Sequence, residues 1–466
     1  MTTYMHYATL LEAASAIQSR KVSPVELTRS MLDRIAKLDP SLRSYATLTP
    51  ELALTQAGAA EAEIAAGNYR GPLHGVPIAV KDICNTAGVV TAAGMTILAD
   101  NVPDHDATVV RRLRDAGAVL LGKLQNTEGA FVNHHPKITP PRNPWNADYY
   151  AGASSSGSGV ATAAGLCFGS LGSDTGGSIR FPSAANGITG LKPTWGRVSR
   201  HGIFALAESS DHVGPMTRSA ADAGAMLGVI AGRDPKDPTT LITPVPDYLA
   251  ELDAGIRAVR IGVDAAYNET GCDPATVAAL REARKVLKDL GATIIEVKLP
   301  DPSGVMVTTA WGATCAVETA IAHEATYPAR SSEYGGLADL IEAGRAASGI
   351  EVMKAHHKRL AFTGNLSVLF SEIDLLLIPT QPRADFTIAQ ERELFATAEG
   401  LSDFVRFATP FDMSGSPTIT LPGGFIAKGL PLSFQLVGRH LEEALLVRAG
   451  DAYQRVTDWH HRHPTL

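Results

Sequence analysis

The sequence predicts a layered α/β fold, with helices on both faces of a largely parallel β-sheet. A helix expected over 107–116 ends at a glycine and leads into an apolar strand over 119–121. A helix over 274–289 leads in the same way into a strand over 293–299. Such alternation is typical of this fold class. No internal repeat, low-complexity tract or long polar linker divides the 466 residues, so a single domain is expected.

Two amphipathic helices are expected within 9–38, because apolar residues recur there at every third or fourth position. Ser23 and Pro24 have the types preferred at a helix start, so the second helix should begin there. The apolar run over 76–80 predicts a buried strand. Lys81 then stands at the carboxyl end of that strand, the end at which open α/β sheets bind their ligands.

Composition and charge exclude several classes of function. Lysine and arginine total 41 against 48 aspartates and glutamates, a formal charge of -7 without a basic stripe, so no nucleic-acid partner is expected. The four cysteines are widely scattered and predict reduced thiols in a cytoplasmic protein. The sequence has no signal-peptide pattern and no run of about 18 uninterrupted apolar residues, so neither secretion nor a membrane is expected.

Glycine and serine are concentrated in two turns, at 152–157 and 174–178. Glycine lets backbone amides approach a ligand closely, so the amides around Gly176 could point at one oxygen and form an oxyanion hole. A Gly/Ser run alone is equally compatible with a solvated linker. The apolar helix expected over 160–166 and the second serine turn one helix–strand unit later argue against a linker.

Other motifs of serine, glycine and histidine do not fit. GxSxG fails at every serine of this stretch, GxGxxG fails because Thr162 occupies the last glycine position, and GxxxxGK[ST] does not occur. The fourteen histidines include adjacent pairs but no HExxH, and adjacent residues do not share a helix face. Neither a nucleotide-binding loop nor a metal site is therefore expected.

The ordered motifs of the chain resemble the amidase signature family, and the resemblance extends over nearly the whole sequence. They are HGVPIAVKD (74–82), RNPW (142–145), GASSSGSG (152–159), GSDTGGSIRFPSAANGITGLKPTWGRVSRHG (172–202), DHVGPMTRS (211–219) and GLPLSFQLVGR (429–439). A single Gly/Ser run would be weak support, whereas six motifs in this order are specific.

The resemblance implies a catalytic triad. Lys81 matches the family's catalytic lysine, Ser154 its bridging serine, which precedes a cis peptide bond, and Ser178 its nucleophile. The two serines are 24 residues apart (178 − 154), as the resemblance leads us to expect. The residues implied to form the oxyanion hole are Thr175, Gly176, Gly177 and Ser178.

The implied fold is a single α/β/α domain around a large, twisted, mixed β-sheet. Residues 1–466 would form it, with N-terminal helices at about 8–70 and a catalytic core at about 71–235. We interpret the segment at about 300–415 as an irregular substrate cap within the same domain. The implied reaction is hydrolysis of a carboxamide to a carboxylate and ammonia or an amine through an acyl-enzyme on Ser178, with no metal or organic cofactor.

The chain departs from the family pattern at two places. Ala153 and Ser156 stand where glycines are usual, and 128–145 differs from the pattern typical of the A component of tRNA-dependent amidotransferases. Two functions remain open, a free-standing amidase for a small-molecule amide and the glutamine-hydrolysing component of such an amidotransferase. Both a homodimer and a complex with a small partner protein are also compatible with the sequence. The intact triad disfavours a third alternative, a non-catalytic interaction protein.

Some aromatic and histidine side chains are expected to line the substrate pocket, although surface or core packing is an equally ordinary role for such residues. The candidates are Phe131, His134, His135, Trp311, His323 and Tyr327. Asp174 and Arg180 flank the proposed nucleophile, and we expect them to form a structural ion pair or to support the loop rather than to act as acid–base groups.

Overall fold

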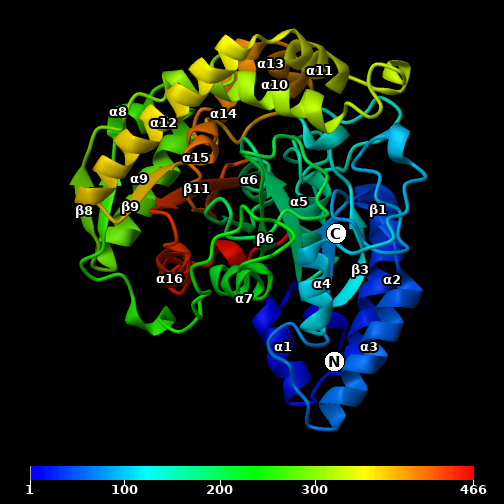
Figure 1. The fold of residues 1–466 in the computed structure, drawn as a ribbon. Coiled ribbons are helices and arrows are strands. Elements are labelled where there is room, and N and C mark those ends of the chain that lie inside the picture. The colour runs from blue at the N-terminus through cyan, green and yellow to red at the C-terminus, as the bar shows by residue number, and fades with distance from the viewer. Residues whose placement is uncertain (1) are drawn as a thin grey trace.

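One mixed β-sheet of eleven strands runs through the protein, as the computed structural model shows for residues 2–466 (Figure 1). Side chains are described from residue 5 onwards. The strands are β1 (Tyr45–Leu48), β2 (Pro77–Lys81), β3 (Val119–Leu124), β4 (Gly169–Asp174), β5 (Thr189–Lys192), β6 (His212–Thr217), β7 (Arg260–Val263), β8 (Thr293–Glu296), β9 (Leu375–Pro379), β10 (Thr418–Phe425) and β11 (Pro431–Gly438). Their order across the sheet is β1-β3-β2-β4-β6-β5-β10-β11-β9-β7-β8.

The expectation of a largely parallel sheet is wrong. Parallel pairs occur on the two flanks, between β2 and its neighbours β3 and β4, and between β7 and its neighbours β8 and β9. The centre is antiparallel from β4 through β6, β5, β10 and β11 to β9. The reason is that β5 and β6, like β10 and β11, follow one another without an intervening helix, so no crossover connection returns the chain in the same direction.

Sixteen α-helices surround the sheet within the described residues. Those outside the 300–415 segment are α1 (Leu10–Gln18), α2 (Pro24–Leu42), α3 (Pro50–Ala65), α4 (Thr108–Asp115), α5 (Ser156–Ala163), α6 (Arg180–Asn186), α7 (Ala220–Ile230), α8 (Ala265–Glu269), α9 (Pro274–Asp289) and α16 (Glu443–Gln454). Helices α6 and α16 lie on opposite faces, because the adjacent β11 residues Gln435 and Phe434 contact Arg180 of α6 and Tyr453 of α16 respectively. The sheet is therefore covered on both faces, which confirms the layered α/β/α fold.

Local sequence signals placed the predicted elements well. Helix α2 begins at Pro24, and the Ser23 hydroxyl accepts hydrogen bonds from the backbone amides of Val25 and Glu26, as its cap position predicts. Helix α9 covers the expected residues, and α4 is one residue shorter than expected at each end. Strand β8 ends three residues before the predicted boundary, at Glu296.

The 300–415 segment is mainly helical, so its description as irregular is wrong. Its helices are α10 (Ala310–Ala322), α11 (Leu337–Ala346), α12 (Gly349–Glu372), α13 (Ile388–Phe395), α14 (Ala398–Val405) and α15 (Thr409–Met413). The Gly335-Gly336 pair and Pro328 lie in the connection between α10 and α11. Strand β9 also belongs to this segment and pairs with β11 and β7, so the segment contributes to the main sheet as well as to the upper edge of the molecule in Figure 1.

One stretch of the cap is long and apolar enough to cross a membrane by length and composition alone. It covers Ser303–Ala322, has a mean hydropathy of 1.3, and 39% of it is buried inside the protein. Helix α10, which makes up most of it, packs against α11 and α12. Glu318 interrupts its apolar character and accepts a hydrogen bond from the Ser209 amide. These contacts are those of a packed helix.

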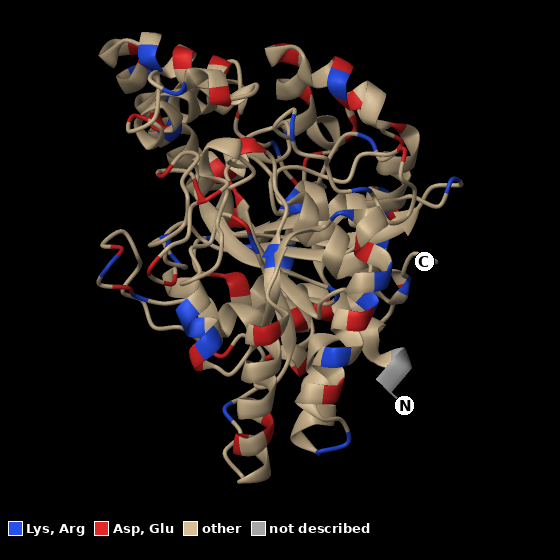
Figure 2. Cartoon of the chain, turned by 90° about the vertical axis from the view of Figure 1, so that its right-hand side faces the viewer, with Lys and Arg blue, Asp and Glu red and all other residues tan. Residues whose placement is uncertain are grey.

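Charged residues of both signs are interspersed along the chain in the view of Figure 2. All four cysteines are free thiols, and Cys84, Cys167 and Cys315 are buried.

Candidate active site

Lys81 ends strand β2 and is completely buried. Its Nζ lies 2.6 Å from Ser154 Oγ and 2.8 Å from Ser173 Oγ. Burial lowers the pKa of Lys81 to about 7, although the nearby Cys84, Asp211 and Asp174 oppose this shift. At neutral pH about half of these lysines would therefore carry a free lone pair at Nζ, which is the form that can accept a proton.

Ser173 was not predicted as a site residue. It lies on β4, which pairs with β2 in parallel, so that Val80 lies opposite Leu171 and Lys81 comes next to the end of β4. The Ser173 hydroxyl is buried and accepts a hydrogen bond from Lys81. The pairing register was the signal that could have revealed it, but a single sequence does not show which strands are neighbours.

Ser154 lies in the first glycine–serine turn, immediately before α5. A cis peptide bond joins Ala153 to Ser154, so it precedes Ser154 and does not follow it as predicted. The backbone of the turn is held from outside, since the amide of Thr127 donates to Ser154 O at 3.2 Å and the amide of Gly157 donates to Gln125 O at 2.9 Å. These bonds fix the hydroxyl of Ser154 beside Lys81.

Ser178 lies in the second turn, between β4 and α6, and lines a cavity. It is half-buried, whereas Ser154 and Ser173 are fully buried, so Ser178 is the one of these three hydroxyls that faces the cavity. The amide of Ser155 donates to Ser178 O at 3.3 Å, which holds the two turns side by side. Among the described residues the Ser178 hydroxyl has no hydrogen-bond partner.

Of the four backbone amides expected to form an oxyanion hole, three are without an acceptor and one is engaged, among the described residues. The amide of Gly177 donates to Asp174 Oδ1 at 2.6 Å, so it is not free to bind a substrate oxygen. The amides of Thr175, Gly176 and Ser178 have no acceptor among the described residues. Gly177 has a φ of +127°, and a Cβ there would lie 2.1 Å from the ring of Phe181, so only glycine fits at this position.

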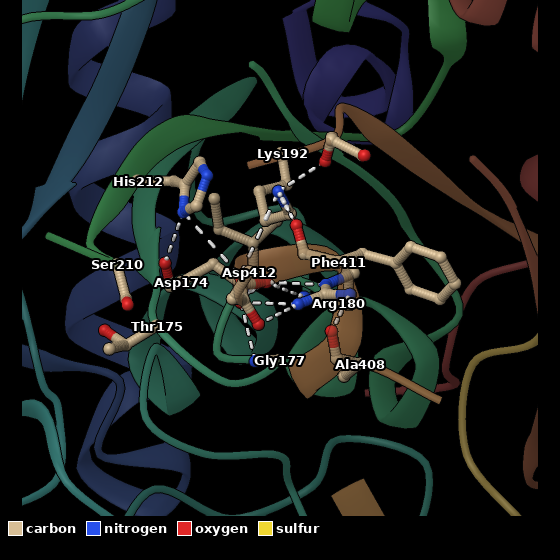
Figure 3. Close-up of polar contacts among 12 residues, drawn as sticks. Asp174, Thr175, Gly177, Arg180, Lys192, Ser210, His212, Ala408, Phe411 and Asp412 are labelled. Atoms are coloured by element: carbon tan, nitrogen blue, oxygen red, sulfur yellow. Dashed lines mark hydrogen bonds and ion pairs between the residues drawn. The ribbon is translucent and has the colours of Figure 1, made fainter. Parts of the chain in front are cut away.

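A buried group of charges supports this turn (Figure 3). Arg180 lies 2.9 Å from Asp174 through both Nε and Nη2, and its Nη2 lies 2.5 Å from Asp412. Burial raises the pKa of Asp174, but the charge and hydrogen bonds of Arg180 outweigh that effect and hold it well below its usual range. Lys192 and His212 lie 3.9 Å and 3.6 Å from Asp412. The expected Asp174–Arg180 ion pair is therefore present, as part of a larger cluster.

Trp311 of α10 and Phe131 both line the cavity, as expected. Trp311 also supports the turn at 174–178, since its Nε1–H donates to Thr175 O at 2.7 Å. The Thr175 hydroxyl in turn donates to Asp211 Oδ1 at 2.5 Å. Asp211 was not singled out from the sequence, although it begins one of the family motifs.

His134 and His135 do not line the cavity in the described structure. His134 Nε2 lies 3.2 Å from the hydroxyl of Ser156, and burial, reinforced by the charge of Lys81, lowers the pKa of His134 to about 4. His135 Nε2 lies 3.1 Å from Glu333 O. Both imidazoles thus contact neighbouring chain segments and not the cavity.

His323 and Tyr327 also lie outside the lining. His323 Nδ1 is 2.9 Å from the hydroxyl of Tyr334, and the Tyr327 hydroxyl donates to Glu342 at 2.7 Å. Their contacts are within the cap. Substrate contact by these two residues and by the two histidines before the serine turn remains a prediction.

Most of the cavity wall was missed by sequence reasoning. It includes Tyr150 and Phe181 from the core and Phe395 and Phe404 from α13 and α14. These helices are more than 200 residues from the serine turns, so no local pattern connects them with the site. Within residues 2–466, no group of three or more His, Cys, Asp or Glu side chains is arranged to hold a metal ion.

A family model described as Amidase matches residues 26–447. The chain belongs to the amidase signature family. It shares 51% identity over 458 residues with a protein of Mycobacterium tuberculosis provisionally named amidase AmiD, covering 98% of this chain and 96% of that one. It shares 40% identity over 490 residues with the A component of the glutamyl-tRNA(Gln) amidotransferase of Chloroflexus aggregans, covering 100% of this chain and 99% of that one.

The fold agrees with solved structures of amidase signature hydrolases. The native peptide amidase of Stenotrophomonas maltophilia superposes with a TM-score of 0.84 at 31% identity, covering 99% of each chain. The chain is therefore an amidase, a hydrolase that acts on amide substrates, and the mixed-sheet fold that the resemblance implied is confirmed.

Proposed function

We propose that Ser178 is the nucleophile of this amidase and that Ser154 and Lys81 take its proton. The observation that carries the proposal is the 2.6 Å contact between Lys81 Nζ and Ser154 Oγ, at a lysine whose burial lowers its pKa to about 7. A serine hydroxyl is a weak nucleophile unless a base removes its proton as it attacks. Ser173 would accept one Nζ–H of the neutral Lys81, and the lone pair could then turn toward Ser154.

The reaction then follows in two halves. Ser178 Oγ attacks the carbonyl carbon while its proton moves to Ser154 Oγ and the Ser154 proton moves to Lys81 Nζ. The carbonyl oxygen becomes an oxyanion, which the free amides of Thr175, Gly176 and Ser178 would stabilise. When the C–N bond breaks, the proton returns through Ser154 to the leaving nitrogen, which departs as ammonia or an amine.

The same groups then hydrolyse the acyl-enzyme. Water attacks the Ser178 ester, and its proton follows the same path through Ser154 to Lys81. The C–O bond to Ser178 breaks, and Oγ recovers the proton from Lys81 through Ser154. The product is a carboxylic acid, which ionises to the carboxylate at neutral pH. Every proton in the cycle is carried by this chain or by the substrate and water.

Replacing Ser178 by alanine tests the proposal. The variant should keep its fold and lose turnover of every amide by several orders of magnitude, because the attacking atom is gone. Ser183→Ala is a matched control: Ser183 also lies near the start of α6, but its buried hydroxyl only donates to Ile179 O at 2.8 Å. Full activity in Ser178→Ala, or an equal loss in the control, would contradict the assignment.

We propose further that the chain works as a free-standing amidase. The 40% identity to an amidotransferase component is the observation that favours the other candidate, a glutamine-hydrolysing protein that delivers ammonia to a partner. Ammonia release by the purified chain alone, across a panel of amides, would support the free-standing enzyme. Activity that appears only when a second protein is added, and only with glutamine, would support the alternative.

A further inference from the structure

The cavity at Ser178 has an apolar wall. Of the sixteen residues that line it within the described chain, none carries a charged side chain. Six of them are aromatic and come from four separate parts of the chain: Phe131, Tyr150, Phe181, Trp311, Phe395 and Phe404. Phe131 and Phe395 are half-buried, and the other four rings are buried and form the floor of the wall behind them.

The polar side chains of the wall other than Ser178 make hydrogen bonds within the protein, although the Tyr150 O–H has no acceptor among the described residues. The Thr175 hydroxyl donates to Asp211, the Trp311 Nε1–H donates to Thr175 O, and the Tyr150 hydroxyl accepts from the Ala153 amide at 2.9 Å. Ser178 and the free amides beside it remain to bind the substrate. The Tyr150 O–H, which lies against the Ala153 amide beside the first serine turn, is the other free hydrogen-bonding group of the wall.

The rings of the wall already pack on one another in the geometries that aromatic groups prefer. Tyr150 and Phe404 have ring centroids 5.7 Å apart at an interplanar angle of 89°, and Phe181 and Phe404 have centroids 5.1 Å apart. A substrate ring in the same cavity could extend this cluster by edge-to-face contacts, which add to the gain from burying its area. A linear or small amide could not make such contacts.

We infer that the substrate is an uncharged aryl or arylalkyl carboxamide, with its ring among these aromatic side chains and its amide at Ser178. The inference rests on the proposed role of Ser178. A charged group attached near the carbonyl would lose its water in the cavity without finding a counter-ion, which is strongly unfavourable. Glutamine, with an ammonium and a carboxylate, is therefore a poor fit.

Glu391 is the nearby charge that could change this conclusion. It lies on α13, four residues before Phe395, and interacts electrostatically with Tyr150. It does not line the cavity, and burial raises its pKa to about 7, which favours the neutral acid more than at an exposed glutamate. A cationic substrate is thus the informative comparison.

A matched series of amides tests the inference with the purified full-length chain. The substrates are acetamide, cyclohexylacetamide, phenylacetamide, its 4-carboxy and 4-aminomethyl derivatives, and glutamine. We expect kcat/KM for phenylacetamide to exceed that for acetamide by about 10- to 100-fold from ring burial. It should exceed that for cyclohexylacetamide by about 2- to 10-fold from ring–ring contacts. Both charged derivatives and glutamine should be at least about 100-fold poorer than phenylacetamide.

The outcomes separate this inference from the proposed function. Preference for acetamide, glutamine or either charged derivative, with activity that still requires Ser178, would overturn the aryl assignment and leave the nucleophile intact. Equal rates for phenylacetamide and cyclohexylacetamide would overturn the aromatic part. Hydrolysis that persists in Ser178→Ala, or no hydrolysis of any amide, would refute the proposed function, and the inference would fall with it.

A gain-of-function variant gives a second test. Val132 lines the cavity and is only half-buried, so it lies at the more open part of the wall. Val132→Arg should raise kcat/KM for the 4-carboxy derivative relative to phenylacetamide by about 10-fold or more, because a guanidinium supplies the missing counter-ion. Val132→Leu is the matched control and should leave that ratio unchanged. An unchanged ratio in Val132→Arg would show that this part of the wall does not meet the substrate ring, and an equal rise in Val132→Leu would show that the effect is not one of charge.

Discussion

The pH dependence of the rate follows directly from the burial of Lys81. With its pKa lowered to about 7, about half of the enzyme has the neutral amine at pH 7. An exposed lysine of pKa about 10.5 would be neutral in only about 0.03% of molecules at that pH. Burial thus supplies roughly a 1000-fold increase in the active form, which corresponds to about 4 kcal/mol. Because the base form exists above the pKa, kcat/KM should rise tenfold per pH unit below about 7 and level off above it.

The assay is kcat/KM for a neutral amide between pH 5 and 10 in the parent and in Lys81→Ala. The parent should show the acidic limb near pH 7, and the variant should lose orders of magnitude in rate together with that limb. The double variant Lys81→Ala/Ser154→Ala should be scarcely slower than the worse single variant, because the two residues act as one relay. A limb that persists without Lys81, or strictly multiplicative losses, would refute the relay.

Three further changes test the surroundings of the relay. Asp174→Asn removes the charge that pairs with Arg180 in a buried cluster and should lower the free energy of unfolding in urea by about 3–5 kcal/mol, whereas an unchanged midpoint would show that the cluster does not stabilise the fold. Trp311→Phe removes the hydrogen bond to Thr175 O and should lower kcat about 2- to 12-fold, with less effect on KM. A change in KM alone would contradict the idea that Trp311 supports the turn at 174–178. Lys81→Met should stabilise the protein more at pH 6 than at pH 9, because the unfolded lysine binds a proton between about pH 7 and 10.5 that the folded one does not. An equal stability gain at both pH values would contradict the lowered pKa.

Local signals in the sequence predicted the helices and their boundaries. Ser23 and Pro24 fixed the start of α2, and the glycines after α4 and α9 fixed their ends, because caps and stops act within a few residues. The direction of the central strands could not be read in this way. It depends on which strands pair across the sheet, and β4 pairs with β6 only through residues 38 or more positions apart.

The site residues that belong to a sequence motif could be predicted. Those that only the fold brings into the site could not. Lys81, Ser154 and Ser178 came from ordered motifs, and the structure brings Lys81 and Ser154 into contact. Ser173 was missed because its role depends on the pairing of β2 with β4. The cap aromatics, such as Phe404, were missed because tertiary packing alone brings α14 to the serine turns.

The turn at 174–178 shows a further limit of prediction from the sequence. The motif suggested four amides, but the position of the Asp174 carboxylate decides that Gly177 is engaged. A side chain three residues away along a turn can point in several directions, and burial of Arg180 selects the one observed. Such competition between partners is visible only in three dimensions.

The acyl-enzyme itself is the most direct test of the proposed mechanism. The parent enzyme, quenched in acid during turnover of an arylacetic anilide, should gain the mass of the arylacetyl group, and peptide mapping should locate that group on Ser178. Ser183→Ala should acquire the same adduct, and Ser178→Ala should acquire none. An acyl group on any other residue, or turnover in Ser178→Ala at the parent rate, would contradict nucleophilic catalysis by Ser178.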